Sequence, residues 1–236
     1  MEQAYQFAAG PVFRFCFALM ALGLLRKILL FAYGRSMAMK LTRDRSIAVG
    51  PALREGVRWF MPLGKASPKG AAFAAVSVMF HAGLLLVPLF LEEHLLLLRS
   101  ATGVYWPALP AGAADAMTAI ALMAALYLLA SRALRASLRK ISGGQDYGFL
   151  GLIVLIFLTG LLASRPFNPF SYSGTMFTHA MAGNILMAFL PFSKMAHGIL
   201  LPAVRYLSLA GWKLSPGSPG RVVKEAESAP PDGAGA

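Results

Sequence analysis

Five long apolar runs separated by short polar segments dominate the chain. The runs cover about residues 8–33, 71–98, 113–131, 147–163 and 173–192. A helix that crosses a membrane needs ~20 mainly apolar residues, and each run approaches or exceeds that length. The last run is expected to continue as a helix to about residue 207. The pattern predicts an all-α fold, in which five transmembrane helices form one domain over residues 1–207.

Composition supports a membrane location. Hydrophobic residues make up 57% of the 236 residues, and charged residues only 14%. In a soluble chain the formal net charge of +12 would favour a nucleic-acid partner. Here the basic residues lie between apolar runs, so they indicate orientation in a membrane, and no nucleic-acid partner is expected. The single cysteine, Cys16, excludes disulfides and cysteine-based metal or iron–sulfur sites within the chain.

Basic residues are concentrated in alternate connections and in the C-terminal region. They are Arg35, Lys40, Arg43, Arg45, Arg54, Arg58, Lys65 and Lys69; then Arg132, Arg135, Arg139 and Lys140; and finally Lys194, Arg205, Lys213, Arg221 and Lys224. The other two connections carry only Arg99 and Arg165. The positive-inside rule then places the N-terminus outside and the C-terminus in the cytoplasm.

Two segments outside the runs are expected on the cytoplasmic side. Residues 34–70 form a basic loop, and its stretch "ALREGVRWFMPLG" has apolar residues at roughly helical spacing. This stretch is either an amphipathic helix on the membrane surface or part of a solvated loop. Residues 215–236 are rich in proline, glycine, alanine and serine, which predicts a disordered tail.

All four histidines of the chain lie in two of the runs. His81 and His94 are in the second run, and His179 and His197 are in the fifth. An ionisable residue within a membrane span is costly and usually functional, although a lone histidine is often a structural hydrogen-bonding group. The even division of all four between two helices favours a shared function.

The spacing of the histidines predicts two separate sites. His179 and His197 are eighteen residues apart, which is five helical turns, so they would share a face at a separation of ~27 Å. Because the second and fifth runs cross in opposite directions, His81 should face His197 near the inner surface, and His94 should face His179 near the outer surface. Two facing histidines on neighbouring helices are the axial ligands of a bis-histidine haem. No CxxCH motif is present, so two non-covalent b haems are expected.

The second run needs a bend to satisfy this arrangement. His81 and His94 are thirteen residues apart, which turns a straight helix by about 220°. Pro88 lies between them and is expected to kink the helix and redirect His94. Small residues beside the ligands, which would leave room for a porphyrin, are Gly83, Gly183 and Gly198.

Three stretches of the sequence resemble a known family. "FHAGLLLVPLFLEEH", "YWPALPAGAADAMT" and "LPFSKMAHGILLPAVRYL" resemble the respiratory nitrate reductase gamma-subunit family of five-span dihaem cytochromes b. The similarity covers about residues 5–207 and points to the membrane subunits of redox complexes in sulfate-reducing bacteria, including the high-molecular-weight cytochrome c complex. The resemblance implies an inner haem on His81 and His197 and an outer haem on His94 and His179. The thirteen-residue interval is longer than in true nitrate reductase subunits, and the chain has no site for reducing an oxyanion.

The resemblance also supports a quinone site on the outer side, with menaquinone as the expected quinone. Oxidation of a quinol releases two protons and needs a nearby acid or base. Glu92, Glu93 and Asp115 are the candidate proton carriers. The alternative is that these acids are only solvated at the outer interface or paired with Arg99.

Two further groups of residues lie near the predicted membrane surfaces. Lys194 and Arg205 flank His197 and either contact haem propionates or anchor the inner membrane face. The aromatic residues of the outer edge, which are typical of an interfacial belt, are Tyr105, Trp106, Phe167, Phe170 and Tyr172.

These features predict an electron-transfer subunit of a larger oxidoreductase complex. Electrons would pass between the quinone pool and partner subunits through two b haems, and no residue of the chain itself is expected to be catalytic. The expected partners are membrane lipid and a cytoplasmic iron–sulfur subunit docked on the basic loops. The resemblance adds a periplasmic multihaem cytochrome c and other integral membrane subunits. The alternative is a non-redox membrane protein, a small transporter or an assembly anchor, with structural histidines.

Overall fold

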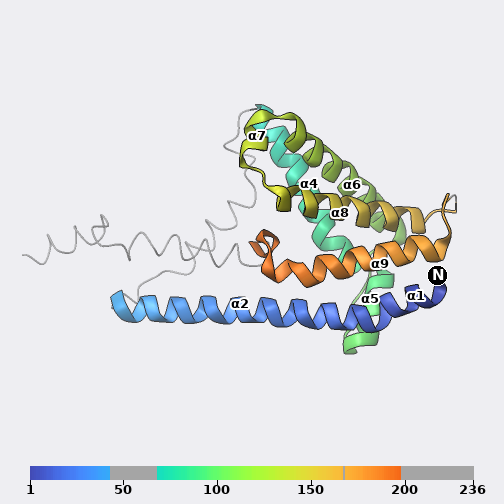
Figure 1. The fold of residues 1–236 in the computed structure, drawn as a ribbon, viewed down its shortest axis with the longest axis horizontal. Coiled ribbons are helices and arrows are strands. Elements are labelled where there is room, and N and C mark those ends of the chain that lie inside the picture. Colours follow the sequence, from blue (N-terminus) through green and yellow to red (C-terminus); the bar gives the residue numbers. More distant parts are fainter. Residues whose placement is uncertain (43–67, 167, 198–236) are drawn as a thin grey trace, which may run out of the picture. The chain divides into compact units, whose positions relative to one another are not determined.

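The computed structural model describes residues 1–42, 68–166 and 168–197 (Figure 1). The regular elements among these residues are all helices, which confirms the predicted all-α class. The described residues divide by their contacts into two compact units. The first contains residues 1–22, 68–166 and 168–192, and the second contains residues 23–42 and 193–197.

Four helical segments are long and apolar enough to cross a membrane. They are Glu2–Gly34, Gly70–Phe90, Ala111–Leu134 and Gly144–Ala163. These segments suggest a multi-pass membrane protein. The predicted fifth span corresponds to helix α9 (Tyr172–Phe189), which is not among them, because polar residues such as Thr175 and Asn184 lower its hydropathy and are buried in the bundle. The fifth span and the predicted orientation therefore stay predictions.

The first run extends beyond its predicted bounds at both ends. Helix α1 (Glu2–Phe7) continues through the π-helical turn η1 (Ala8–Val12) into α2 (Phe13–Thr42). The first part of the predicted 34–70 loop is therefore helical, which suits its methionine, alanine, lysine and leucine residues. The candidate surface helix in residues 52–64 and the C-terminal tail lie outside the described residues.

The second run is not one helix, and its break lies at Leu91, three residues after Pro88, where a kink was predicted. Helix α4 (Pro68–Phe90) passes through Pro88 and ends at Phe90, Leu91 is extended at φ −76° and ψ 131°, and α5 (Glu92–Thr102) follows. The break is stabilised by groups distant in sequence, because Trp106 Nε1 donates to the Leu89 carbonyl and Leu109 N to that of Phe90, each at 2.8 Å. The two acidic residues that begin α5 are favourable at a helix N-terminus.

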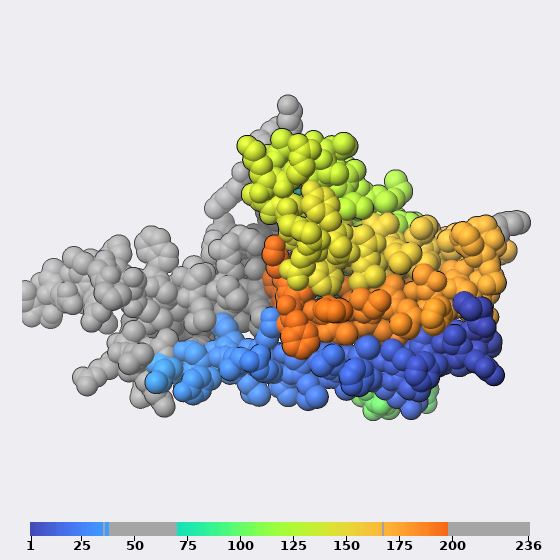
Figure 2. All heavy atoms as spheres, viewed as in Figure 1, coloured from blue at the N-terminus to red at the C-terminus, as the bar shows by residue number. Residues whose placement is uncertain are grey.

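The helices of the first unit pack in a series. Helix α4 packs against α6 (Ala111–Leu134), α6 against α8 (Gly144–Ala163), and α8 against α9, while the short α7 (Ala136–Ile141) follows α6. The side chains of α8 and α9 adjoin in the space-filling view (Figure 2; α8 yellow, α9 orange). Asn184 of α9 also donates a 2.9 Å hydrogen bond to the carbonyl of Ala8 in η1.

The glycines do not all have the predicted role. A Cβ atom at Gly83 would collide with the Cβ atom of Ala121, so Gly83 permits close packing of α4 on α6 rather than leaving room for a porphyrin. A Cβ atom at Gly183 would meet nothing within 4 Å, so there the space exists. Gly198 lies outside the described residues.

The fifth helix ends earlier than predicted. Helix α9 stops at Phe189 and is followed by the 3₁₀ turns η3 (Leu190–Phe192) and η4 (Lys194–Ala196). Pro191 has no backbone N–H to continue an α-helix, and Ser193 is extended and caps η4 by accepting from Met195 N at 3.1 Å. The expectation that His179 and His197 share one face of a straight helix is therefore wrong.

Candidate functional site

The imidazole rings of His94 and His179 face each other between α5 and α9. Their centroids are 5.9 Å apart, and their planes are 14° from parallel. His94 reaches this position because α5 starts anew after the break at Leu91 and does not follow the register of α4. The structure thus brings together one of the two histidine pairs that the sequence predicts.

Helix α8 contacts the His179 ring through both polar and backbone atoms. The Nδ1 atom of His179 lies 3.0 Å from the Ile156 carbonyl oxygen and 3.2 Å from Thr159 Oγ1. A carbonyl can only accept, so Nδ1 carries the hydrogen, and Nε2 keeps its lone pair. A Cβ atom at Gly160 would lie 3.1 Å from His179 Cε1, so this glycine lets the ring approach the α8 backbone.

The Nδ1 atom of His94 is buried at the α4–α5 break. It has no hydrogen-bond partner among the described residues, although the His94 side chain lies near the backbone of Val87 and Pro88. A buried polar atom without a partner costs about 1–3 kcal/mol, so its retention calls for an explanation. A small movement that completed a bond to the carbonyl of either residue would place the hydrogen on Nδ1 and leave Nε2 with a lone pair, as at His179.

The remaining two histidines have the same backbone contact. His81 Nδ1 lies 2.7 Å from the Ser77 carbonyl oxygen, and His197 Nδ1 lies 2.6 Å from that of Lys194. Both contacts place the hydrogen on Nδ1. His81 belongs to the first compact unit and His197 to the second, so their predicted pairing stays a prediction.

Glu92 has a specific partner at the start of α5. The hydroxyl of Tyr105 donates to its two carboxylate oxygens at distances of 3.0 and 2.9 Å. This hydrogen bond is the main reason that the pKa of the Tyr105 phenol is raised above its usual value. Arg99 lies over the Tyr105 ring, 5.6 Å from its centroid, and the neighbouring Glu93 is exposed.

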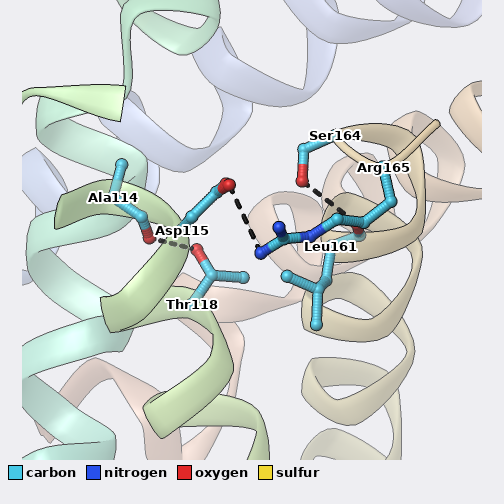
Figure 3. A network of polar contacts seen from close by, with 6 residues as sticks. All are labelled: Ala114, Asp115, Thr118, Leu161, Ser164 and Arg165. Carbon is cyan, nitrogen blue, oxygen red and sulfur yellow. Dashed lines mark hydrogen bonds and ion pairs between the residues drawn. The ribbon is translucent and has the colours of Figure 1, made fainter. Parts of the chain in front are cut away.

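Asp115 pairs with an arginine that the sequence analysis had not connected to it. Its Oδ2 atom lies 3.4 Å from a guanidinium nitrogen of Arg165, which follows α8 (Figure 3). Asp115 is 36% exposed and Arg165 51%, so the ion pair is open to solvent. Thr118, one turn along α6, donates to the Ala114 carbonyl at 2.8 Å rather than to the carboxylate.

The candidate propionate contacts and aromatic belt are placed only in part. Lys194 is exposed on η4, whereas Arg205 and Phe167 lie outside the described residues. Phe170 and Tyr172 are exposed, as an interfacial belt requires. Trp106 has a further role, because it stabilises the end of α4.

Thr159 and Gly160 are site residues that the sequence analysis missed. The available signal was "FLTGLL", in which a threonine and a glycine interrupt an otherwise apolar run. Their contact with His179 is tertiary, so their spacing in the sequence could not show it. Across the described part of the chain, no group of three or more His, Cys, Asp or Glu side chains could hold a metal ion.

The described residues form an all-helical protein, and its four long apolar helices suggest the class of multi-pass membrane proteins. No protein-family model matches the sequence, and no solved structure matches the chain. The chain is similar to a protein of Nitratidesulfovibrio vulgaris strain Hildenborough that is named only "Protein". The two are 28% identical over 200 residues, which is 83% of this chain and 88% of that protein.

Proposed function

We propose that the chain is the membrane cytochrome b subunit of a respiratory redox complex. The observation that carries the proposal is the facing pair His94 and His179, 5.9 Å apart and nearly parallel. Two imidazoles on neighbouring helices are a ligand set for a b haem. The similarity to a protein from a sulfate reducer is compatible with the family resemblance of the sequence.

The donor set of this pair fits a haem iron. Both imidazoles lie on neighbouring helices, 5.9 Å apart between ring centroids, and they would hold the haem between α5 and α9. His179 bonds its Nδ1–H to the Ile156 carbonyl, which leaves Nε2 as the ligand atom. The Nδ1 atom of His94 is buried, and a hydrogen bond from it to a nearby backbone carbonyl would fix the same tautomer.

A second haem would be held by His81 and His197. Both bond Nδ1 to a backbone carbonyl, which places the hydrogen on Nδ1 and the lone pair on Nε2. These Nδ1–carbonyl contacts support the two histidines as metal ligands. That His81 and His197 lie close to each other is part of the proposal. Lys194 and Arg205 are proposed to contact the propionates of this haem or to anchor the inner face.

The bound haems would supply one-electron transfer between a quinone and partner subunits. The chain would fix the imidazole tautomers and provide apolar helices around the ligands. Glu92, Glu93 and Asp115 remain the candidates for accepting protons from a menaquinol, and the ion pair with Arg165 weakens the case for Asp115. A cytoplasmic iron–sulfur subunit and a periplasmic multihaem cytochrome c are the proposed partners, in a bacterial inner membrane with the N-terminus outside.

The proposal is tested by the visible spectrum of the purified chain. We expect b-type bands in the reduced-minus-oxidised spectrum and two haems per chain by the pyridine haemochrome method. His94→Ala and His179→Ala should each remove one and the same haem, and His81→Ala and His197→Ala the other. Gly151→Ala is the control, because a Cβ atom there meets nothing within 4 Å. A spectrum without b-type bands would refute the proposal.

A non-redox membrane protein is the second candidate. The 5.9 Å separation of the His94 and His179 rings also lies within the range of ordinary stacked aromatic pairs, so the pair could serve only to hold α5 on α9. In that case His94→Phe would leave the chain folded and its spectrum unchanged. The first candidate predicts that the same substitution removes a haem.

A further inference from the structure

Helix α8 contributes no histidine, yet it controls the surroundings of one. Three groups in its last two turns contact the His179 ring: the carbonyl of Ile156, the hydroxyl of Thr159 and the backbone of Gly160, which has no side chain. Thr159 is buried, so its hydroxyl contacts the ring away from solvent.

The hydroxyl of Thr159 is oriented by the helix that carries it. Thr159 has one hydroxyl hydrogen, and the Leu155 carbonyl, at 2.6 Å, is its nearest acceptor. With that hydrogen engaged, the oxygen presents lone pairs to the Nδ1–H of His179 at 3.2 Å. The Nδ1–H is therefore shared between two acceptors, the Thr159 hydroxyl and the Ile156 carbonyl.

We infer that Thr159 is a positioning residue that sets both the orientation and the electron donation of His179; the inference rests on the proposed function. An acceptor on Nδ1–H makes an imidazole a stronger donor through Nε2 and stabilises the oxidised form of a metal bound there. Thr159 thus lowers the midpoint potential of the haem held by His94 and His179, relative to a site with the Ile156 carbonyl alone.

The test is a redox titration of the purified, haem-loaded chain, resolved into its two haem components. Thr159→Val removes the acceptor at similar size and should raise the midpoint potential of one component, the one lost in His179→Ala. Thr159→Ser keeps the hydroxyl and should leave both potentials near those of the wild type. Thr118→Val is the matched control, because Thr118 is also buried and its hydroxyl donates to the Ala114 carbonyl of its own helix.

The outcomes separate the inference from the proposed function. A wild-type chain without haem overturns both. A haem-loaded wild type in which Thr159→Val leaves both potentials unchanged, or in which Thr159→Ser shifts them as much as Thr159→Val, overturns the inference alone. If Thr159→Val loses the haem, Thr159→Ala takes its place in the titration. If Thr159→Val and Thr159→Ala both lose the haem while Thr159→Ser retains it, the result supports the positioning role.

Discussion

His94 and His179 lie on different helices, yet their ring planes differ by only 14°. Near-parallel axial imidazoles give a rhombic low-spin ferric signal in electron paramagnetic resonance, whereas perpendicular planes give a highly anisotropic signal. We expect the rhombic signal for the haem that is lost in His94→Ala. A highly anisotropic signal that disappears in His94→Ala would show that the rings rotate away from the observed arrangement.

Gly160 allows the His179 ring to lie against α8. A methyl group there would lie 3.1 Å from His179 Cε1, which is closer than an ordinary contact, so Gly160→Ala should displace the ring. We expect a loss of about 1–3 kcal/mol in the free energy of unfolding, as for other overpacked sites, and reduced content of one haem. The measurements are thermal denaturation in detergent and haem content.

Gly151→Ala is the matched control for this substitution, since it lies on the same helix and has open space at its Cβ position. It should be neutral or stabilising by up to about 1 kcal/mol, because alanine favours the helix over glycine. If both alanine variants behave alike, the close contact at Gly160 has no energetic consequence.

The apolar pattern predicted α6 and α8 to within a few residues, because each is a continuous run bounded by polar or helix-breaking residues. It failed at the ends of α4 and α9. At Phe90 the helix ends two residues beyond Pro88 because Trp106 and Leu109 donate to the free carbonyls, and such tertiary capping has no local signature. The same limit applies to Thr159, whose contact with His179 depends on how α8 and α9 pack.

The backbone of α4 at Gly83 lies directly against Ala121 of α6. Gly83→Ala should cost about 1–3 kcal/mol of unfolding free energy, because the added methyl group collides with the Cβ atom of Ala121. Ala121→Gly in the same chain removes the collision and should restore part of that loss. The two single variants and the double variant form a double-mutant cycle, measured by thermal denaturation. Additive effects would show that the helices shift apart freely.

Trp106 holds the break that gives α5 its own direction. Trp106→Phe keeps an aromatic ring beside Phe90 but removes the donor to the Leu89 carbonyl. We expect a loss of about 0.5–1.5 kcal/mol in unfolding free energy and a lower content of the haem that depends on His94. Tyr172→Phe is the control, because Tyr172 is an exposed aromatic residue. Equal haem content in both variants would exclude this role for Trp106.

The three acidic candidates for proton transfer differ in their partners, and this difference predicts unequal effects on quinol oxidation. Glu92 is bonded to Tyr105, Asp115 is paired with Arg165, and Glu93 is exposed. A solvent-exposed ion pair contributes about 0–1 kcal/mol, so Asp115→Asn should change stability little. Because its carboxylate is paired with the Arg165 guanidinium, which favours the ionised form over accepting a proton, Asp115→Asn should also retain most of the rate of quinol-dependent haem reduction. Glu92→Gln and Glu93→Gln are expected to slow this reaction, and Tyr105→Phe tests whether the phenol acts through Glu92. Full rates in all three acid variants would exclude these residues as proton carriers of the proposed quinone site.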